Sequence, residues 1–538
     1  MKDRYTGIWV ALMGVAVGVL ATTLVFRIDA NRRALRTEYS DWRKLNLILR
    51  SIDENYVDTV DRVKVTDAAV AAALGALDPH SVYMPPVLLE ESEAELQGNF
   101  EGIGIQFNVP NDTAVVLEVI PGGPSEKIGL QPGDRLLKVD DVNIAGVRYP
   151  QDSMVRRMKG PSGTKVTVTV RRGREVIPFE ITRARIPMHS VDAAFMVDDT
   201  TAYLRVGKFA RTTAAEVMQR LAGLPGMKRL VLDLRDNTGG YFDQALLLCN
   251  LFLPKGAAVV YLEGLHRPRK AYRADGNGPY KDIILDVLVN EGSASSSEIV
   301  AGAIQDNDRG LIIGRRSFGK GLVQEPLYFT DGSGVRITVA RYYTPSGRCI
   351  QKPYSSEADY DYDLYHRYAD GEMLSADSIK VDTSSVYLTV GGRKVYGGGG
   401  IVPDIFVPID TTRASKFYQA CSRKATAMRF ASSWFDYHKA ELQAISDYDA
   451  LTAYLDGAGL ERAFLGFARH KDGIRPASSR EWESEKPYMM TQVRALVGRY
   501  SRLGDDAFYH LYLDIDNVFA AAMDNQDNTN RTWQRKSQ

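Results

Sequence analysis

The chain of 538 residues has only three cysteines, Cys249, Cys349 and Cys421, without CxxC or metal-ligand spacing. An odd number of widely separated cysteines predicts neither a disulfide framework nor a zinc site. The chain also lacks an excess charge of either sign, because 67 basic residues balance 67 acidic ones. This balance gives no global basic surface for nucleic acid, so we expect no nucleic-acid partner.

Signatures of the common hydrolase chemistries are also missing. No G-x-S-x-G pattern occurs, and the seven histidines are scattered without evident acid partners. His80, in LDPHS at residues 77–81, follows a predicted helix, where we expect it to cap the helix end. The sequence therefore predicts no Ser-His-Asp triad, no catalytic metal and no cofactor.

One long hydrophobic run stands near the N-terminus. Residues 7–26 contain no charge, and their length as a helix spans the ~30 Å hydrocarbon core of a membrane. The run lacks the short apolar region and small-residue cleavage site of a signal peptide, which favours an uncleaved transmembrane anchor. Basic residues after the run outnumber those before it, so charge alone does not set its orientation. We expect a single-pass protein of the cell membrane with its catalytic region on the extracytoplasmic, periplasmic side.

The length of the chain predicts three or four domains. Apolar residues spaced by three and four predict an N-terminal helical segment over residues 35–96. Residues 97–185 instead hold short β-like runs separated by glycine and proline turns, among them GIGI at 102–105 and LQPGD at 130–134. This order resembles a PDZ domain, in which a GIGI-type loop binds a peptide's terminal carboxylate and the peptide adds as a strand. The resemblance assigns carboxylate binding to Gly102, Ile103, Gly104 and Ile105.

The pattern becomes α/β over residues 186–410. Residues 229–234 form a continuous apolar run, which is typical of a strand buried on both faces of a sheet. Amphipathic helices are predicted on either side of this strand. An acidic, tyrosine-rich insertion occupies residues 355–380, and residues 411–538 are predicted to be helical. The fold class is therefore α/β multidomain.

Two polar residues in small-residue surroundings are the candidates for catalysis. Ser295 opens the helix SSSE at residues 295–298, so a capping box is the simplest interpretation of this serine. Its place at a strand-to-helix turn also suits a nucleophile, because unpaired N–H groups there stabilise an oxyanion. Both interpretations remain open from the motif alone.

Lys320 lies in GRRSFGKG at residues 314–321, which matches a phosphate-binding P-loop up to its last position. Gly321 replaces the Ser or Thr that binds magnesium, and no helix is predicted to follow, which disfavours a nucleotide hydrolase. The alternative role is a general base, because burial among apolar neighbours lowers a lysine pKa. We expect the Gln324 amide to orient the lysine.

Taken together, these motifs resemble the carboxyl-terminal processing peptidases, or tail-specific proteases, which are PDZ-containing serine–lysine peptidases. The matching segments are LDPHS (77–81), LDLRDNTGG (232–240), VNEGSASSSEI (289–299), FGKGLVQ (318–324) and ARYYTPSGR (340–348), within residues 40–410. The resemblance implies a ClpP/crotonase-like protease core with Ser295 as nucleophile, Lys320 as general base and Gln324 as its support. It also implies an oxyanion hole formed by backbone N–H groups of Gly239, Gly240 and Ser296. Thr238 departs from the usual proline of this family.

The expected function is that of a membrane-anchored serine endopeptidase which binds unstructured C-terminal tails through its PDZ domain and cleaves protein substrates near their C-terminus. The alternative is a catalytically inactive, membrane-tethered PDZ adaptor. The sequence leaves open whether the C-terminal helical region forms a homodimer or binds an adaptor protein.

Overall fold

The computed structural model describes residues 40–109, 112–120, 122–354, 360–412 and 415–525. The chain divides into two compact units, Met1–Leu77 and Asp78–Gln538. The anchor predicted over residues 7–26 lies outside the described residues. None of the described helices is both long and apolar enough to cross a membrane.

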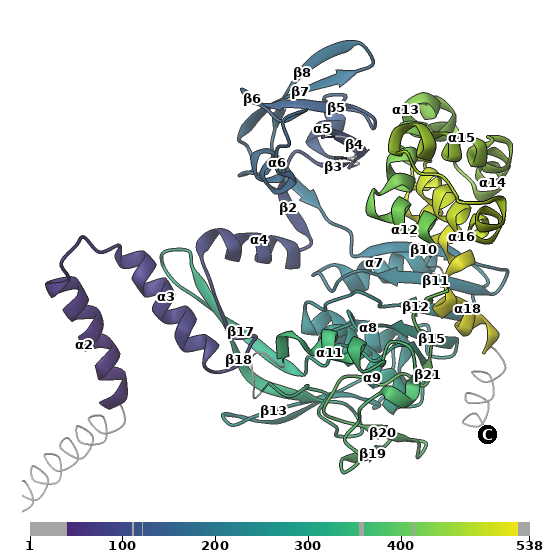
Figure 1. Cartoon of the computed structure of the whole chain (residues 1–538). Helices are drawn as coiled ribbons and strands as arrows, with labels where there is room; N and C mark the ends of the chain where they lie inside the picture. Colours follow the sequence, from purple (N-terminus) through teal and green to yellow (C-terminus); the bar gives the residue numbers. More distant parts are fainter. Residues whose placement is uncertain (1–39, 110–111, 121, 355–359, 413–414, 526–538) are drawn as a thin grey trace, which may run out of the picture. The chain divides into compact units, whose positions relative to one another are not determined.

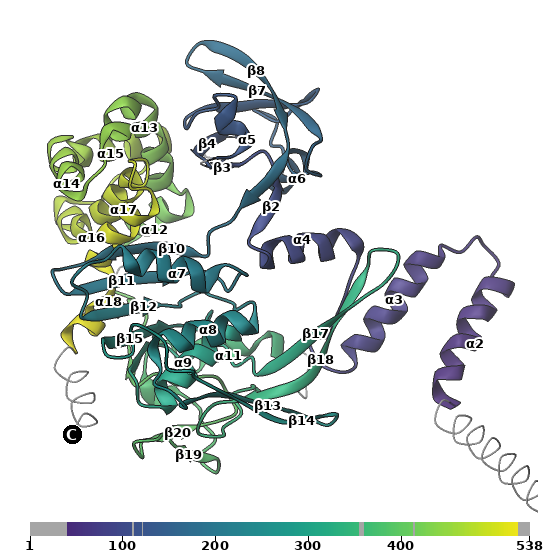
Figure 2. The same ribbon diagram turned by 180° about the vertical axis from the view of Figure 1, so that it is seen from behind.

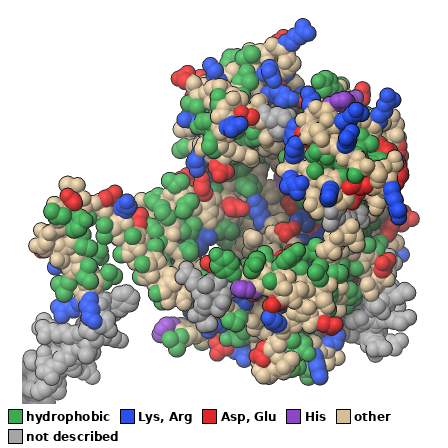
Figure 3. Space-filling model, viewed as in Figure 1, with side chains coloured by type: hydrophobic (Ala, Val, Ile, Leu, Met, Phe, Trp, Pro, Cys, Tyr) green, Lys and Arg blue, Asp and Glu red, His purple; other side chains and the backbone are tan. Residues whose placement is uncertain are grey.

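The first unit contains two described helices, α2 (Ser40–Asn55) and α3 (Arg62–Gly75). Asp61 caps α3, because its side chain accepts a hydrogen bond from the Lys64 main-chain N–H at 3.1 Å. Apolar side chains such as Leu47 and Val63 remain exposed on this unit. Figure 3 shows green, hydrophobic side chains on its surface.

A six-stranded sheet forms the centre of the second unit, in the order β10-β11-β12-β15-β16-β21. Its strands are β10 (Val191–Met196), β11 (Thr201–Val206), β12 (Arg229–Asp233), β15 (Ile284–Val289), β16 (Leu311–Gly314) and β21 (Ile405–Phe406). β10 is antiparallel to β11, and the other neighbouring pairs are parallel. All residues of β12 are buried, which confirms the interior strand predicted from its continuous apolar run.

Helices cover both faces of this sheet (Figure 1). On one face α7 (Thr213–Ala222), α8 (Phe242–Phe252) and α9 (Ser296–Asp306) pack into a core that includes Leu230 and Leu232. On the other face Val231 lies in a second core, which also contains Val518 and Phe519 of α18 (Asn517–Asp524). Successive residues of β12 thus face opposite cores, as the two-residue period of a strand requires.

A second, antiparallel sheet contains β1 (Val82–Met84), β13 (Ala258–Gly264), β14 (Arg267–Arg273), β17 (Leu322–Tyr328) and β18 (Gly334–Tyr343). The sequence predicted the β18 strand but not this sheet. The strand order is β1-β18-β13-β14, with β17 paired to β18. The segment after His80 therefore lies against β18, more than 200 residues later in the chain. β17 begins two residues after Lys320, so this sheet positions the candidate base.

The region predicted to be a PDZ domain forms a sheet in the order β3-β4-β5-β7-β8, with β6 paired to β5. Its elements are β3 (Ile105–Asn108), β4 (Ala114–Val119), α5 (Pro124–Lys127), β5 (Arg135–Val139), β6 (Val142–Asn143), α6 (Gln151–Met158), β7 (Lys165–Arg172) and β8 (Glu175–Thr182). α6 packs onto the sheet through Met154, which lies in the same core as Leu136 and Val168. A separate two-stranded ribbon, β2 (Asn99–Gly102) with β9 (Ala184–Pro187), joins this domain to the chain on either side.

The helical region predicted after residue 411 is confirmed, and its helices gather together in Figure 2. They are α12 (Lys416–Arg423), α13 (Thr426–Ala444), α14 (Tyr448–Gly457), α15 (Leu460–Phe467), α16 (Ser479–Gly498) and α17 (Asp505–Tyr512), followed by α18. Phe430, Phe464 and Val493 lie in a hydrophobic core of their own. An ion pair between Asp436 of α13 and Arg135 of β5 links these helices to the PDZ-like sheet.

Candidate active site

Ser295 lies directly before α9, at the turn that follows the central strand β15. Its backbone has φ 54° and ψ −112°, an uncommon conformation for a residue other than glycine. Backbone strain of this kind is concentrated at functional sites. The strained turn places the Ser295 side chain beside the N-terminus of α9, where N–H groups lack helical partners.

The buried carboxylate of Glu298 joins the Ser295 turn to the Lys320 loop. Its Oε2 accepts hydrogen bonds from the main-chain N–H groups of Ser295, at 2.9 Å, and Lys320, at 2.8 Å. Its Oε1 accepts from the Ser317 hydroxyl at 2.5 Å and the Gly319 N–H at 2.8 Å. Burial raises the pKa of Glu298, and these four hydrogen bonds oppose that rise. Glu298 therefore does more than complete a helix cap: it fixes two separate loops against each other.

Lys320 lies in the loop between β16 and β17, and its Nζ donates to Gln324 Oε1 at 3.3 Å. Burial lowers the pKa of Lys320, and the positive charge of Arg336 lowers it further. The Tyr342 hydroxyl is hydrogen-bonded to the Lys320 carbonyl and lies 3.1 Å from the Ser295 carbonyl oxygen. The segment after Lys320 is strand β17 rather than a helix, so the phosphate-binding geometry of a P-loop is not formed.

Gln324 is held in turn by the LDPHS segment. Its Nε2 donates to the His80 carbonyl, while the Asp78 carboxylate accepts from the His80 and Ser81 N–H groups, each at 2.9 Å. The prediction that His80 caps the helix end is wrong, because α3 ends at Gly75 with Ala76 as its C-cap, whereas the His80 carbonyl accepts from Gln324. Burial, assisted by the nearby Lys320 charge, lowers the pKa of His80 to about 4.

The glycine turn after β12 approaches Ser295 closely. A Cβ atom on Gly239, whose φ is 102°, would lie 2.8 Å from Ser295 Cβ and 3.0 Å from the Ser296 nitrogen. The Gly239 N–H itself donates to Asn237 Oδ1 at 2.9 Å, so it is not available as an oxyanion donor in this structure. The N–H groups of Gly240 and Ser296 have no acceptor within the described residues. Of the three predicted donors, these two remain.

Ser295, Ser296, Lys320 and Gln324 all border one cavity of about 740 Å³, together with Gly239 and Gly240. Its other walls include Lys208, Phe209, Phe242, Ile299, Arg336 and Tyr342. The structure thus brings together every residue that the sequence placed in the catalytic centre. No group of side chains suited to holding a metal ion occurs in the described parts of the chain.

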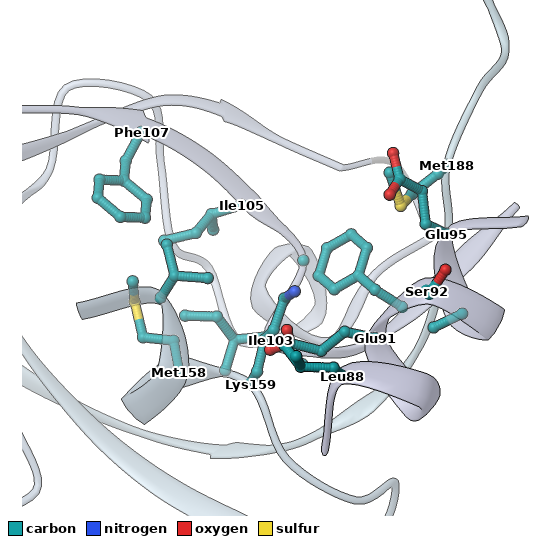
Figure 4. Close-up of a pocket in the computed structure, with 15 residues that line it drawn as sticks. Leu88, Glu91, Ser92, Glu95, Ile103, Ile105, Phe107, Met158, Lys159 and Met188 are labelled. Atoms are coloured by element: carbon teal, nitrogen blue, oxygen red, sulfur yellow. The ribbon is translucent and has the colours of Figure 1, made fainter. Parts of the chain in front are cut away.

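The four residues predicted to bind a carboxylate line a second cavity, of about 580 Å³, between β3 and α6. Gly104 has φ 76° and lies in the loop before β3, as a glycine-dependent turn requires. Phe107 and Met158 supply apolar wall, and Figure 4 shows Ile103, Ile105 and Lys159 around the same space. The sequence did not predict the remaining wall, which consists mainly of α4 (Pro86–Leu96), with Phe100 and Met188.

A family model described as Peptidase family S41 matches residues 200–362, and one described as PDZ domain matches residues 115–172. A protein of Staphylococcus aureus (strain N315) called "Probable CtpA-like serine protease" is 32% identical over 346 residues, or 63% of this chain and 69% of that protein. The chain belongs to peptidase family S41. A Staphylococcus haemolyticus protein of the same name is 31% identical over 346 residues, with the same two coverages, 63% and 69%.

Two solved structures are similar to parts of this S41 peptidase. The photosystem II D1 C-terminal processing protease is 26% identical and covers 67% of this chain and 92% of its own, with a TM-score of 0.35. The PDZ domain of a carboxy-terminal protease from Vibrio cholerae, solved with a peptide, is 27% identical and covers 17% and 99%, with a TM-score of 0.16. The family expected from the sequence is confirmed: the chain is a serine-type peptidase of family S41 with a PDZ domain.

Sequence reasoning missed several contacts of the S41 site. Glu298 was assigned only to a helix cap, although it also binds the Lys320 loop 22 residues further along the chain. Tyr342 lies in the matching segment ARYYTPSGR, but the sequence assigned it no role, because a tyrosine inside an apolar strand is usually a core residue. The spacing of Ser295 and Glu298 was the one available signal, and it does not reveal a second, distant partner.

Proposed function

We propose that this S41 peptidase is a membrane-anchored serine endopeptidase that binds C-terminal tails through its PDZ domain and cleaves them with a Ser295–Lys320 dyad. The observation that carries the proposal is the Glu298 carboxylate, which accepts from the N–H groups of Ser295 and Lys320 at 2.9 and 2.8 Å. One buried group thereby fixes the main chain of both members of the dyad at the wall of one cavity.

In the proposed reaction, Ser295 Oγ attacks the carbonyl carbon of the scissile bond while neutral Lys320 Nζ takes its proton. The resulting ammonium then protonates the leaving amine, the C–N bond breaks, and an acyl-enzyme remains. Water, deprotonated by Lys320, hydrolyses the ester and restores Ser295. The lowered pKa of Lys320 supports this role, because only a neutral amine can accept the proton.

The contact between Lys320 and Gln324 is compatible with this role. A neutral amine keeps two N–H donors and one lone pair. With one N–H donated to Gln324 Oε1 at 3.3 Å, the lone pair remains free to accept from Ser295. Gln324 would thus orient the base rather than compete with the nucleophile.

The N–H groups of Gly240 and Ser296 are the proposed oxyanion donors. Both groups lack an acceptor among the described residues, and both residues border the cavity. Donors of this kind each contribute about 3 kcal/mol to the stability of a tetrahedral intermediate.

The PDZ groove is the proposed site of tail binding. A tail would add as a strand along β3, with its carboxylate at the Gly102–Ile105 loop. The apolar walls formed by Ile103, Phe107 and Met158 suit an apolar C-terminal side chain.

The proposed membrane anchor rests on the uncharged run at residues 7–26. The catalytic region would face the extracytoplasmic side. Membrane fractionation of the full chain and of a variant lacking residues 1–36 tests the anchor, and protease accessibility in spheroplasts tests the side. A full chain recovered in the soluble fraction contradicts this part of the proposal.

The catalytic proposal is tested with a fluorescence-quenched peptide that ends in an apolar residue. Wild-type protein should cleave it, whereas Ser295→Ala and Lys320→Arg should be folded and inactive, since arginine keeps the charge but cannot become neutral. Amidation of the peptide's terminus should raise KM, because it removes the carboxylate. A folded and fully active Lys320→Arg protein rules out the dyad. A wild-type protein that binds tails without ever cleaving them favours the adaptor alternative.

A further inference from the structure

The insertion at residues 355–380, which the sequence left unexplained, contacts the loop that leads to the candidate base. Its described part, residues 360–380, contains α11 (Asp363–Ala369, labelled in Figure 1), and Glu372 follows shortly after this helix. The contacts involve consecutive residues of the loop, from Arg316 to Gly319. They therefore act on the backbone immediately before Lys320.

Arg367 of α11 binds the main chain of this loop. It is 5% exposed, and its guanidinium donates to the carbonyls of Arg316, at 2.6 Å, and Ser317, at 3.2 Å. Its Nε also donates to Glu372 at 2.9 Å, and Glu372 accepts two further hydrogen bonds from the Arg316 side chain, at 2.8 and 2.6 Å. Two buried guanidinium groups thus share one buried carboxylate, and removal of Arg367 leaves both loop carbonyls without this donor.

The next two residues of the loop are held by Tyr360 and Lys352. The Phe318 ring packs edge-on against the Tyr360 ring, with centroids 6.2 Å apart. Lys352 Nζ lies 4.1 Å from the Phe318 centroid and 4.0 Å from that of Tyr360, a cation–π arrangement. The Lys352 N–H also donates to the Gly319 carbonyl at 2.9 Å. Every residue from Arg316 to Gly319 therefore has a partner in or beside the insertion.

Tyr360 is also connected to the Lys320 side chain, through the hydrogen bonds of His80 and Gln324. The Tyr360 hydroxyl is hydrogen-bonded to His80 Nε2, and the His80 carbonyl accepts from Gln324. Gln324 in turn accepts from Lys320 Nζ. The insertion thus contacts the main chain ahead of the lysine and the chain of hydrogen bonds that holds its side chain.

We propose that the segment Tyr360–Glu372 is a positioning element for Lys320, in which Arg367 and Tyr360 are the positioning residues. Neither residue borders the catalytic cavity, so neither is expected to touch substrate. This inference rests on the proposed function, because it takes Lys320 as the base. Misplacement of a catalytic group by about 1 Å costs roughly 100-fold in rate. Loss of Arg367 should therefore lower kcat while KM stays the same.

The test measures kcat, KM, the pH dependence of kcat/KM and stability in urea for Arg367→Met and Arg367→Lys. The matched control is Arg429→Met, which removes a partly buried ion pair with Asp472 (2.7 Å) in the C-terminal helices. We expect Arg367→Met to lose about 100-fold in kcat per folded molecule. We also expect the acidic limb of its kcat/KM profile to move to higher pH, toward the ordinary pKa of a lysine. Arg367→Lys should recover stability, because it keeps the charge beside Glu372, but not kcat, because one ammonium does not reproduce the guanidinium's two contacts with the loop.

Three results overturn the inference. The first is an Arg367→Met protein with wild-type kcat and pH profile, and the second is a kcat loss that Arg429→Met reproduces at equal loss of stability. The third is an Arg367→Lys protein in which kcat recovers together with stability. If Arg367→Met does not fold, Tyr360→Phe decides: about a fivefold loss of kcat, equivalent to one hydrogen bond, supports the inference, and an unchanged kcat refutes it. An active Lys320→Arg protein would instead refute the proposed function itself.

Discussion

Replacing Glu298 by glutamine should disable the site while leaving Ser295 and Lys320 chemically intact. Glutamine keeps the size of the side chain but turns one acceptor oxygen into an NH₂ donor. Glu298 accepts four hydrogen bonds, two at each oxygen, so either orientation of the amide leaves two donors facing another donor. The substitution thus perturbs the link between the loops of the dyad and neither member of it.

The magnitude follows from these contacts. Each buried donor left without an acceptor costs about 1–3 kcal/mol, so two cost about 2–6 kcal/mol. Removing a buried charge offsets part of this cost, because burial penalises the ionised form and raises the pKa of Glu298. We expect a net loss of about 2–4 kcal/mol in unfolding free energy. We also expect roughly a 100-fold loss in kcat, because the loops are no longer fixed against each other.

The assay combines urea unfolding with tail-peptide cleavage, corrected for the folded fraction. Glu216→Gln is a matched control, because Glu216 also accepts from main-chain N–H groups, those of Ser190 at 2.7 Å and Val191 at 3.2 Å. Both variants should lose stability, and only Glu298→Gln should lose kcat per folded molecule. Equal kcat in the two variants would refute the view that Glu298 positions the dyad.

Three further predictions concern the surroundings of the site. Arg336→Gln should raise the pKa of Lys320, because it removes a cation that lowers it, and should move the acidic limb of kcat/KM to higher pH; an unmoved limb contradicts this. Gly239→Ala should abolish activity even if the protein folds, since its Cβ would lie 2.8 Å from Ser295 Cβ; active-site labelling and kinetics check this. The pKa of His80 is about 4 when folded and 6.5 when unfolded, so the unfolded state binds more protons between these values. The unfolding free energy should therefore fall as pH drops from 6.5 toward 4, less steeply in His80→Phe, as urea titrations at pH 7 and pH 5 would show.

The local parts of this fold could be predicted from sequence because they depend on neighbouring residues. The apolar run of β12 and the helix after Ser295 both follow from patterns a few residues long. The residues of the catalytic cavity were also identified, but through resemblance to a family. Neither residue was decisive by itself, since a helix cap was the simplest interpretation of Ser295 and the motif around Lys320 also resembled an incomplete P-loop.

What the sequence did not predict depends on contacts between distant segments. The Asp78 turn binds β18 through Thr338, whose hydroxyl lies 3.1 Å from the carboxylate, across 260 residues of chain. No periodicity marks such a pairing in advance. The loss of Gly239 as an oxyanion donor has a similar origin at short range, because it depends on where the Asn237 side chain points. Hydrogen-bond partners, rather than residue identities, were the missing information.

The Glu298 link has a consequence for a chain that is still being synthesised. Its two loops become joined only after residue 320 has been made, and the Lys320 loop gains its remaining supports from Tyr342, Lys352 and Arg367. On the proposed mechanism, Ser295 has no base beside it before then and is an ordinary, unreactive alcohol. A partly made or partly unfolded copy is therefore unable to cut itself or its neighbours. We expect proteolysis to begin only with the completed fold.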